Sequence, residues 1–208
     1  MNRPVALKGK PITNVLTYLK AKHPGCTIPP GRMKHIDMQS FRQEDYGKAG
    51  DCTITSMATI LFHQLGCKDP KGFQRVYDAV EAAATRSGYS GKGTNPFAMR
   101  TILDRSGKEF NLQIKSKVKY LKGVGWNFDH VKDSINKGKP VMLSLNNDGR
   151  DYYTNHTITI CGYAIYECKL SDGTKSQELF FQVYDNWRTE VRYLDYQMLS
   201  TVSSINCL

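Results

Sequence analysis

The sequence has no long hydrophobic run. No stretch approaches the roughly 20 apolar residues that a membrane-spanning helix needs, and the first eight residues, MNRPVALK, lack the apolar segment of a secretory signal. We therefore expect no membrane span and a cytoplasmic protein. Had a leader been removed, the same chain would be expected outside the cell or on its surface.

Clustered cysteines are also missing. The six cysteines form no Cys-x-x-Cys pair and no Cys/His cluster with the spacing of zinc ligands. With 208 residues, of which 40% are hydrophobic, the chain can bury a full core without disulfides. We expect reduced thiols, no metal site and no cofactor.

Acidic residues are in deficit. Lysine and arginine outnumber aspartate and glutamate by 29 to 19, a formal charge of +10. Such a surplus favours anionic partners, among them nucleic acid, cell-wall polymers and lipid headgroups. The basic residues are dispersed, as in KSKVK at 115–119, and no nucleic-acid motif accompanies them. The charge predicts a solvated basic surface and no specific nucleic-acid site, and it leaves a cell-wall polymer open as a partner.

The chain shows no internal repeat. Helical patterns come first, near 12–22, 52–66, 72–87, 96–105 and 129–137, and strand patterns follow at 141–145, 156–166 and 179–184. This segregation indicates an α+β protein rather than a parallel α/β one. We expect a single monomeric domain over 1–208, with a mainly helical lobe over about 1–137 and an antiparallel-sheet lobe over about 138–208.

Cys52 opens one of the apolar helical patterns. A helix N-terminus together with an imidazolium can lower a thiol pKa from about 8.5 to roughly 3.5–7.5, and the thiolate is the nucleophile. Gly50 would let the preceding backbone turn sharply, and Asp51 could cap the helix. A cysteine in such a helix can also be simply a small buried hydrophobe.

Two further polar positions complete a pattern. His156 opens a strand pattern, and Asp185-Asn186-Trp187 closes another. Each alone could be a core histidine or the polar end of a strand. Together they give the chain order Cys, His, then Asp or Asn, which is the order of papain-like thiol hydrolases.

Five segments carry a family resemblance. The chain resembles the papain-like cysteine peptidases and, within them, small bacterial proteins akin to the double-glycine leader peptidases of the C39-like branch. The matching segments are FRQ at 41–43, GDCTITS at 50–56, GKPVM at 138–142, NHTITICGY at 155–163 and VYDNW at 183–187. The resemblance implies a papain-like fold, with a helical lobe packed on an antiparallel-sheet lobe, and a peptide or protein substrate in the cleft between them.

The resemblance also implies roles. Cys52 would be the nucleophile and His156 the general base that later protonates the leaving group. The leader-peptidase branch favours Asp185 as the residue that orients the imidazole, with Asn186 as the alternative, since neighbours on a strand point to opposite faces. An amide donor to the oxyanion is expected at Gln43, with Gln39 as second candidate. Gln43 lies nine residues before Cys52, farther than usual in the family, so residues 44–49 must bulge.

Other functions share these features. A cell-wall amidohydrolase uses the same residue types, and the irregular glutamine spacing also suits a non-catalytic binding module. Residues 152–155, which precede His156, are expected to line the cleft and recognise substrate side chains, or else to form a plain loop. In the tail, Tyr193, Tyr196, Leu199 and Ile205 are expected to close the sheet lobe as a strand or helix, or to form a wall beside the substrate.

Overall fold

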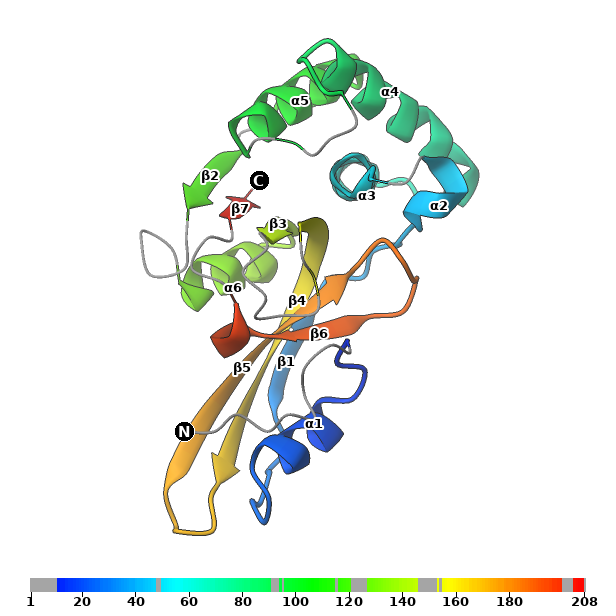
Figure 1. Ribbon diagram of the computed structural model, residues 1–208. Helices are drawn as coiled ribbons and strands as arrows, with labels where there is room; N and C mark the ends of the chain where they lie inside the picture. The colour runs from blue at the N-terminus through cyan, green and yellow to red at the C-terminus, as the bar shows by residue number, and fades with distance from the viewer. Residues whose placement is uncertain are drawn as a thin grey trace.

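A computed structural model describes residues 11–47, 50–90, 94, 96–114, 116–120, 127–145, 153, 155–199 and 204–207. Helices gather at one end of the molecule, an antiparallel sheet crosses its middle, and a long hairpin with a further helix forms the other end (Figure 1). This is the α+β arrangement that the sequence predicts, with most helices early in the chain and most strands late.

One sheet organises the second half of the chain. Its strands run antiparallel in the order β2-β7-β3-β4-β5-β6, and β1 pairs with residues 162–165 of β4. The bounds are β1 Arg32–His35, β2 Lys117–Tyr120, β3 Val141–Leu145, β4 His156–Lys169, β5 Lys175–Tyr184, β6 Arg192–Asp195 and β7 Ser204–Cys207. His156 is thus the first residue of the longest strand, and Asp185 directly follows β5.

The helical end is built around one buried helix. Residues 52–62 of α3 (Cys52–Gln64) are all buried, including its threonines and Ser56. Beside it lie α4 (Phe73–Thr85) and α5 (Pro96–Glu109), and the short α2 (Gln43–Tyr46) precedes it. In α4 the buried residues recur at helical spacing: Phe73, Val76, Tyr77, Val80, Ala83 and Ala84. Burial of that face positions the start of α3, where Cys52 lies.

The sheet is covered on both faces near β3. Met142 belongs to the core formed with α3, α4 and α5, whereas Leu143 belongs to a second core. That second core includes Phe128, Val131 and Ile135 of α6 (Phe128–Asn136). Because successive residues of a strand face opposite sides, β3 joins the two cores.

An additional helix secures the far end of the hairpin. α1 (Val15–Lys22) begins after Asn14, whose side chain accepts a hydrogen bond from the N–H of Thr17. It buries Val15 and Leu19 against residues of β4 and β5. Lys22 Nζ lies 2.7 Å from a carboxylate oxygen of Glu178 and 2.8 Å from one of Asp195. Glu178, only 1% exposed, also contacts His23.

The sequence patterns located most of the elements but not all of them. The predicted helices at 72–87 and 129–137 are α4 and α6, and the predicted strand at 141–145 is β3. However, β1 and β2 come from the first 137 residues and still join the sheet, and α1 packs on the sheet rather than on the helical end. All four residues of β1 are exposed, so this strand has no alternating apolar pattern to reveal it.

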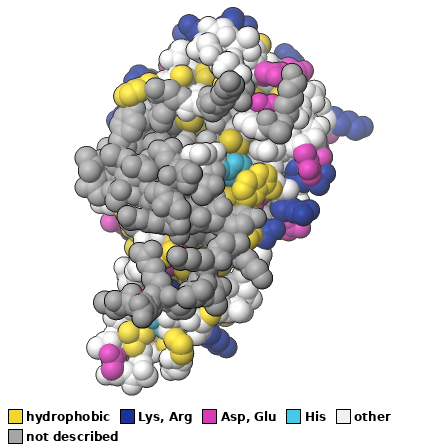
Figure 2. Space-filling model, viewed as in Figure 1, with side chains coloured by type: hydrophobic (Ala, Val, Ile, Leu, Met, Phe, Trp, Pro, Cys, Tyr) yellow, Lys and Arg dark blue, Asp and Glu magenta, His cyan; other side chains and the backbone are white. Residues whose placement is uncertain are grey.

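The tail closes the sheet, one of the two outcomes expected for it. Tyr193 lies in β6, Tyr196 begins a short 3-10 turn, and Leu199 is buried in the sheet core. None of the helices in the described part of the chain is long and apolar enough to cross a membrane. On the face shown in Figure 2, lysine and arginine side chains are scattered, not gathered into one patch.

Candidate active site

Cys52 is the first residue of α3 and is 9% exposed. Gly50, two residues earlier, has a φ of 102°, a left-handed conformation that favours glycine, so the chain turns sharply into the helix as predicted. At this position the sulfur lies close to backbone N–H groups that have no partner within the helix. The positive end of the helix dipole therefore favours the thiolate over the thiol.

Asp51 does not cap this helix, contrary to the sequence-based expectation. It occupies the N-cap position, but its side chain makes no capping hydrogen bond. Instead its carboxylate accepts hydrogen bonds from the hydroxyls of Tyr77, at 3.0 Å, and Tyr89, at 2.9 Å. The carboxylate is therefore drawn toward α4 and away from the first turn of α3.

His156 reaches the sulfur from the sheet. Burial raises the pKa of the Cys52 thiol, but a hydrogen bond with His156 and the charge of that imidazole outweigh it and hold the pKa below its ordinary value. The N–H of Thr157 also donates to Sγ of Cys52, at 3.4 Å. The structure thus brings the two residues together across the junction of α3 and β4, and it adds a backbone donor that the sequence did not reveal.

The imidazole is held from behind by a main-chain atom. Nε2 of His156 lies 2.7 Å from the carbonyl oxygen of Asp185. The carboxylate of Asp185 makes other bonds: it accepts the N–H groups of Trp187 and Arg188, each at 3.0 Å, and the hydroxyl of Tyr153 at 3.1 Å. Asp185 is therefore adjacent to His156, but its side chain shapes the turn that presents its own carbonyl.

Asn186 faces the opposite way. Its Nδ2 lies 3.0 Å from the carbonyl oxygen of Cys52, 2.8 Å from Oγ of Ser56 and 2.9 Å from the carbonyl oxygen of Thr157. The residue adopts a φ of 62°, a left-handed conformation that asparagine and glycine adopt more readily than other residues. Rather than orienting the imidazole, Asn186 connects the first turn of α3 to the start of β4.

Two aromatic rings surround the imidazole. The ring centroid of Trp187 lies 4.2 Å from that of His156, with the planes stacked at 22°, and the ring of Tyr153 lies 5.9 Å away. Tyr153 is buried, so it contacts His156 and Asp185 instead of an open cleft. The predicted cleft residues Tyr152 and Thr154 lie outside the described residues. The sequence signals for this cluster were the Trp after Asp185-Asn186 and the tyrosines just before His156.

The structure separates the two glutamines. The amide of Gln39 donates to the carbonyl of Lys68 beyond the end of α3, at 2.5 Å. Gln43 begins α2, and its backbone N–H donates to the carbonyl of Asn186 at 2.8 Å, which ties it to the turn after β5. Its Oε1 is buried without a hydrogen-bond partner. Part of the expected bulge at 44–49 is formed by α2, which extends to Tyr46.

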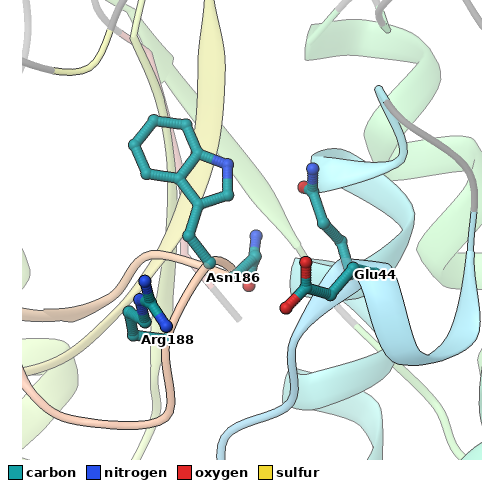
Figure 3. A pocket seen from close by; sticks show the side chains of 5 residues that line it. Glu44, Asn186 and Arg188 are labelled. Carbon is teal, nitrogen blue, oxygen red and sulfur yellow. The ribbon is translucent and has the colours of Figure 1, made fainter.

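An open pocket of about 420 Å³ lies between α2 and the turn after β5. Its lining residues are Gln43, Glu44, Asn186, Trp187 and Arg188. Figure 3 shows Glu44 on the helix side and Asn186 and Arg188 on the turn side, facing each other across the space. Among the described residues, no group of three or more His, Cys, Asp or Glu side chains could hold a metal ion.

The buried thiol and the imidazole thus meet where a helical end joins an antiparallel sheet, the arrangement of papain-like proteins. The pocket is lined by residues near them and not by Cys52 or His156 themselves. The family model described as the Peptidase_C39 like family matches residues 35–202, which is most of the chain. The chain belongs to this family, and membership points to a cysteine peptidase. No match was found among curated proteins or among solved structures.

Proposed function

We propose that this protein is a thiol hydrolase that cleaves peptide bonds through an acyl-enzyme on Cys52. One observation carries the proposal: a cysteine at the first position of a buried helix is paired with an imidazole from the sheet, and its pKa is held below the ordinary value. A lowered pKa supplies thiolate near neutral pH without further activation. Membership of a C39-like peptidase family points to the same chemistry.

In the first half of the reaction, the Cys52 thiolate attacks the carbonyl carbon of the substrate. The negative charge moves to the carbonyl oxygen, which accepts hydrogen bonds from the backbone N–H of Cys52 and from the side-chain amide of Gln43. His156 then protonates the departing nitrogen, and a thioester remains on Cys52.

In the second half, water replaces the amine. His156, now neutral, takes a proton from the water as the water attacks the thioester carbon. The intermediate collapses, the carboxylic acid leaves, and the thiolate and imidazolium are restored. The carbonyl of Asp185 accepts a hydrogen bond from Nε2 throughout, so the other ring nitrogen, Nδ1, carries out both proton transfers.

The pocket between α2 and the turn after β5 is the proposed substrate site beside the reacting pair. It contains Gln43, the proposed oxyanion donor, and Trp187, which stacks on His156. A substrate in the pocket therefore lies close to the Gln43 amide and to the Trp187 ring that stacks on His156. Because His156 protonates the leaving nitrogen, the part of the substrate beyond the scissile bond is expected on the Trp187 side.

Covalent capture tests the proposal. Cys67 is exposed and would react with any thiol reagent, so a Cys67→Ser variant serves as the parent. A peptidyl acyloxymethyl ketone is expected to add one label to the parent and none to the Cys67→Ser, Cys52→Ala double variant, as read by intact-protein mass spectrometry. Equal labelling of the two proteins would overturn the proposal. Matching thermal unfolding curves establish that both are folded.

Turnover then identifies the substrate class. An unstructured, dye-quenched protein substrate and purified peptidoglycan are digested in parallel with the parent and with the Cys52→Ala variant. We expect Cys52-dependent cleavage of the protein substrate. Release of soluble fragments from peptidoglycan alone would instead identify a cell-wall amidohydrolase.

A further inference from the structure

A buried carboxylate stands directly before the proposed nucleophile, and the reaction described above does not use it. Asp51 is only 6% exposed, and its two oxygens accept separate hydrogen bonds from the hydroxyls of Tyr77 and Tyr89. Isolated buried carboxylates are costly, so charged groups in protein interiors are hydrogen-bonded. The two tyrosines supply these bonds at the point where the chain enters α3.

The two hydroxyls come from different segments. Tyr77 lies in α4 and is 1% exposed within the helical core, whereas Tyr89 follows α4 and is partly exposed. Burial, and then the nearby Asp51, raise the pKa of both phenols, so both remain protonated donors. Asp51 is therefore attached to α4 by the bond from Tyr77 and to the segment after α4 by the bond from Tyr89.

The backbone at Gly47, shortly before Asp51, also packs closely against the hydroxyl of Tyr77. A Cβ placed on Gly47 would collide with the hydroxyl oxygen of Tyr77 and would lie 2.8 Å from Oδ2 of Asp51. Only glycine lets the backbone pass there. Gly47 and Asp51 thus both pack against the Tyr77 hydroxyl. These two residues stand on either side of residues 48–50, just before Cys52, so Tyr77 helps to fix how the chain approaches Cys52.

The direction of the Asp51 side chain has a chemical consequence. An aspartate at an N-cap normally accepts hydrogen bonds from N–H groups of the first helical turn. Here those bonds are absent, and the negative charge points toward α4. The N–H groups of Thr53 and Ile54, which a cap at Asp51 would use, are consequently not taken up by this carboxylate, and its charge lies away from the Cys52 N–H.

We propose that Tyr77 and Tyr89 are positioning residues: by binding Asp51 against α4, they fix the backbone N–H of Cys52 where it receives the oxyanion. This inference rests on the proposed hydrolase function. It adds that residues outside the reacting groups set the position of the oxyanion donor. If the tyrosine hydroxyls are removed, we expect the Asp51 carboxylate to accept from the N–H of Thr53 or Ile54, as an N-cap side chain does, which displaces the Cys52 N–H and brings a negative charge toward the oxyanion.

Two reactions of the same sulfur separate this role from thiolate activation. Acylation by 4-nitrophenyl acetate develops an oxyanion, whereas alkylation by iodoacetamide does not. In the Cys67→Ser parent, the Tyr77→Phe, Tyr89→Phe double variant is expected to acylate at least tenfold more slowly, since loss of one oxyanion donor lowers rates by about 10²–10³. Its alkylation rate at saturating pH should stay within about twofold of the parent.

Three further variants make the result decisive. Asp51→Asn keeps partners for both hydroxyls without the charge and should acylate nearly as fast as the parent, whereas Asp51→Ala should resemble the double variant. Tyr46→Phe is the matched control, because Tyr46 packs against Tyr77 and is neither of the two phenols that donate to Asp51, and it should change neither rate. If the double variant does not fold, Tyr89→Phe alone, at the partly exposed phenol, gives the same comparison.

The outcomes distinguish the two proposals. No Cys52-dependent burst of nitrophenolate from the parent would count against the hydrolase function itself. A parent that acylates normally, together with tyrosine variants that acylate equally fast, would overturn the positioning role. Parallel loss of acylation and alkylation would overturn it too, because it would place the effect on the thiolate.

Discussion

Nε2 of His156 lies 2.7 Å from the backbone carbonyl oxygen of Asp185, while the Asp185 carboxylate accepts hydrogen bonds from Tyr153, Trp187 and Arg188. A carbonyl oxygen only accepts hydrogen bonds, so Nε2 carries a proton and Nδ1 is left to face the thiol. The third group of the site is thus supplied by the main chain. The side chain of Asp185 holds the turn in which that main-chain atom lies.

Substitution of Asp185 should therefore show whether its side chain acts through its negative charge on His156 or by holding the turn that presents its carbonyl. Asp185→Asn keeps an oxygen for the N–H groups of Trp187 and Arg188, and we expect acylation within about tenfold of the parent. Asp185→Ala leaves buried donors unpaired, at about 1–3 kcal/mol for each group, and should lower both thermal stability and acylation. A loss of about 10⁴ in Asp185→Asn, the size seen when an orienting carboxylate becomes an amide, would contradict a carbonyl-held imidazole.

The pH dependence of alkylation should report the pairing of Cys52 with His156. Because the pKa of Cys52 is lowered, iodoacetamide should react half-maximally below about pH 8.5, the value for a free thiol. His156→Gln removes the hydrogen bond and the positive charge but leaves the sulfur buried. The midpoint should then move above that value. A midpoint that is the same in both proteins would show that the imidazole does not act on the sulfur.

Asn186 should prove important for stability. Its amide contacts Cys52, Ser56 and Thr157 from a backbone with a φ of 62°. Asn186→Gly keeps that backbone accessible and loses the hydrogen bonds, and we expect the free energy of unfolding in urea to fall by about 1–3 kcal/mol. Asn186→Ala should lose about 1 kcal/mol more, since alanine disfavours a positive φ. Equal losses would argue against strain at this position.

The ion pairs of Lys22 should make the fold sensitive to acid. Burial raises the pKa of Glu178, but hydrogen bonds from Lys22 and Ser176 and the charge of Lys22 hold it below its usual range. A carboxyl group with a depressed pKa in the folded state stabilises the protein above its unfolded pKa of about 4.3, and this stabilisation disappears as the pH falls through the folded value.

We therefore expect urea stability to fall as the pH is lowered from 5 to 3, and to fall less steeply in Glu178→Gln. At pH 7, Lys22→Met should destabilise the protein by about 3 kcal/mol, because it leaves two buried carboxylates without their cation. Lys20→Met, on the same helix and without an ion pair among the described residues, is the control. An identical pH response of wild type and Glu178→Gln would contradict the role of this carboxylate.

Arg188 should bias the choice of substrate. It lines the pocket without an ion pair among the described residues, whereas Glu44 on the opposite wall is paired with Arg42. Peptides with an acidic residue just beyond the scissile bond should therefore have a lower KM than matched basic ones. Exposed ion pairs contribute about 0.2–1 kcal/mol, so Arg188→Gln should change the ratio of KM values by about two- to fivefold. A ratio that Arg188→Gln leaves unchanged would exclude this contact.

The sequence anticipated the elements that carry strong periodic patterns and the residue types of the site. The face of α4 that contains Phe73, Val76, Tyr77 and Val80 was evident from its spacing, and so were the positions of Cys52 and His156 at the starts of their elements. Such patterns record which side chains are buried, and burial is largely what determines these elements.

The details that the sequence did not reveal depend on the main chain or on distant partners. A carbonyl that accepts from His156 has no side-chain signature, because every residue possesses one. The diversion of Asp51 depends on tyrosines 26 and 38 residues away, and local preference alone favours a cap. The contact of Gln43 with the turn after β5 likewise exists only once α2 has folded against it.

The amide of Asn186 ties the helical end of the molecule to the sheet beside the proposed substrate pocket. Moving the helical end away from the sheet would break the contacts of this amide with the carbonyl of Cys52 and the hydroxyl of Ser56, both on α3. We therefore expect a long substrate to enter the proposed site by rearrangement of pocket side chains such as Glu44 and Arg188, with the sulfur and the imidazole keeping their separation.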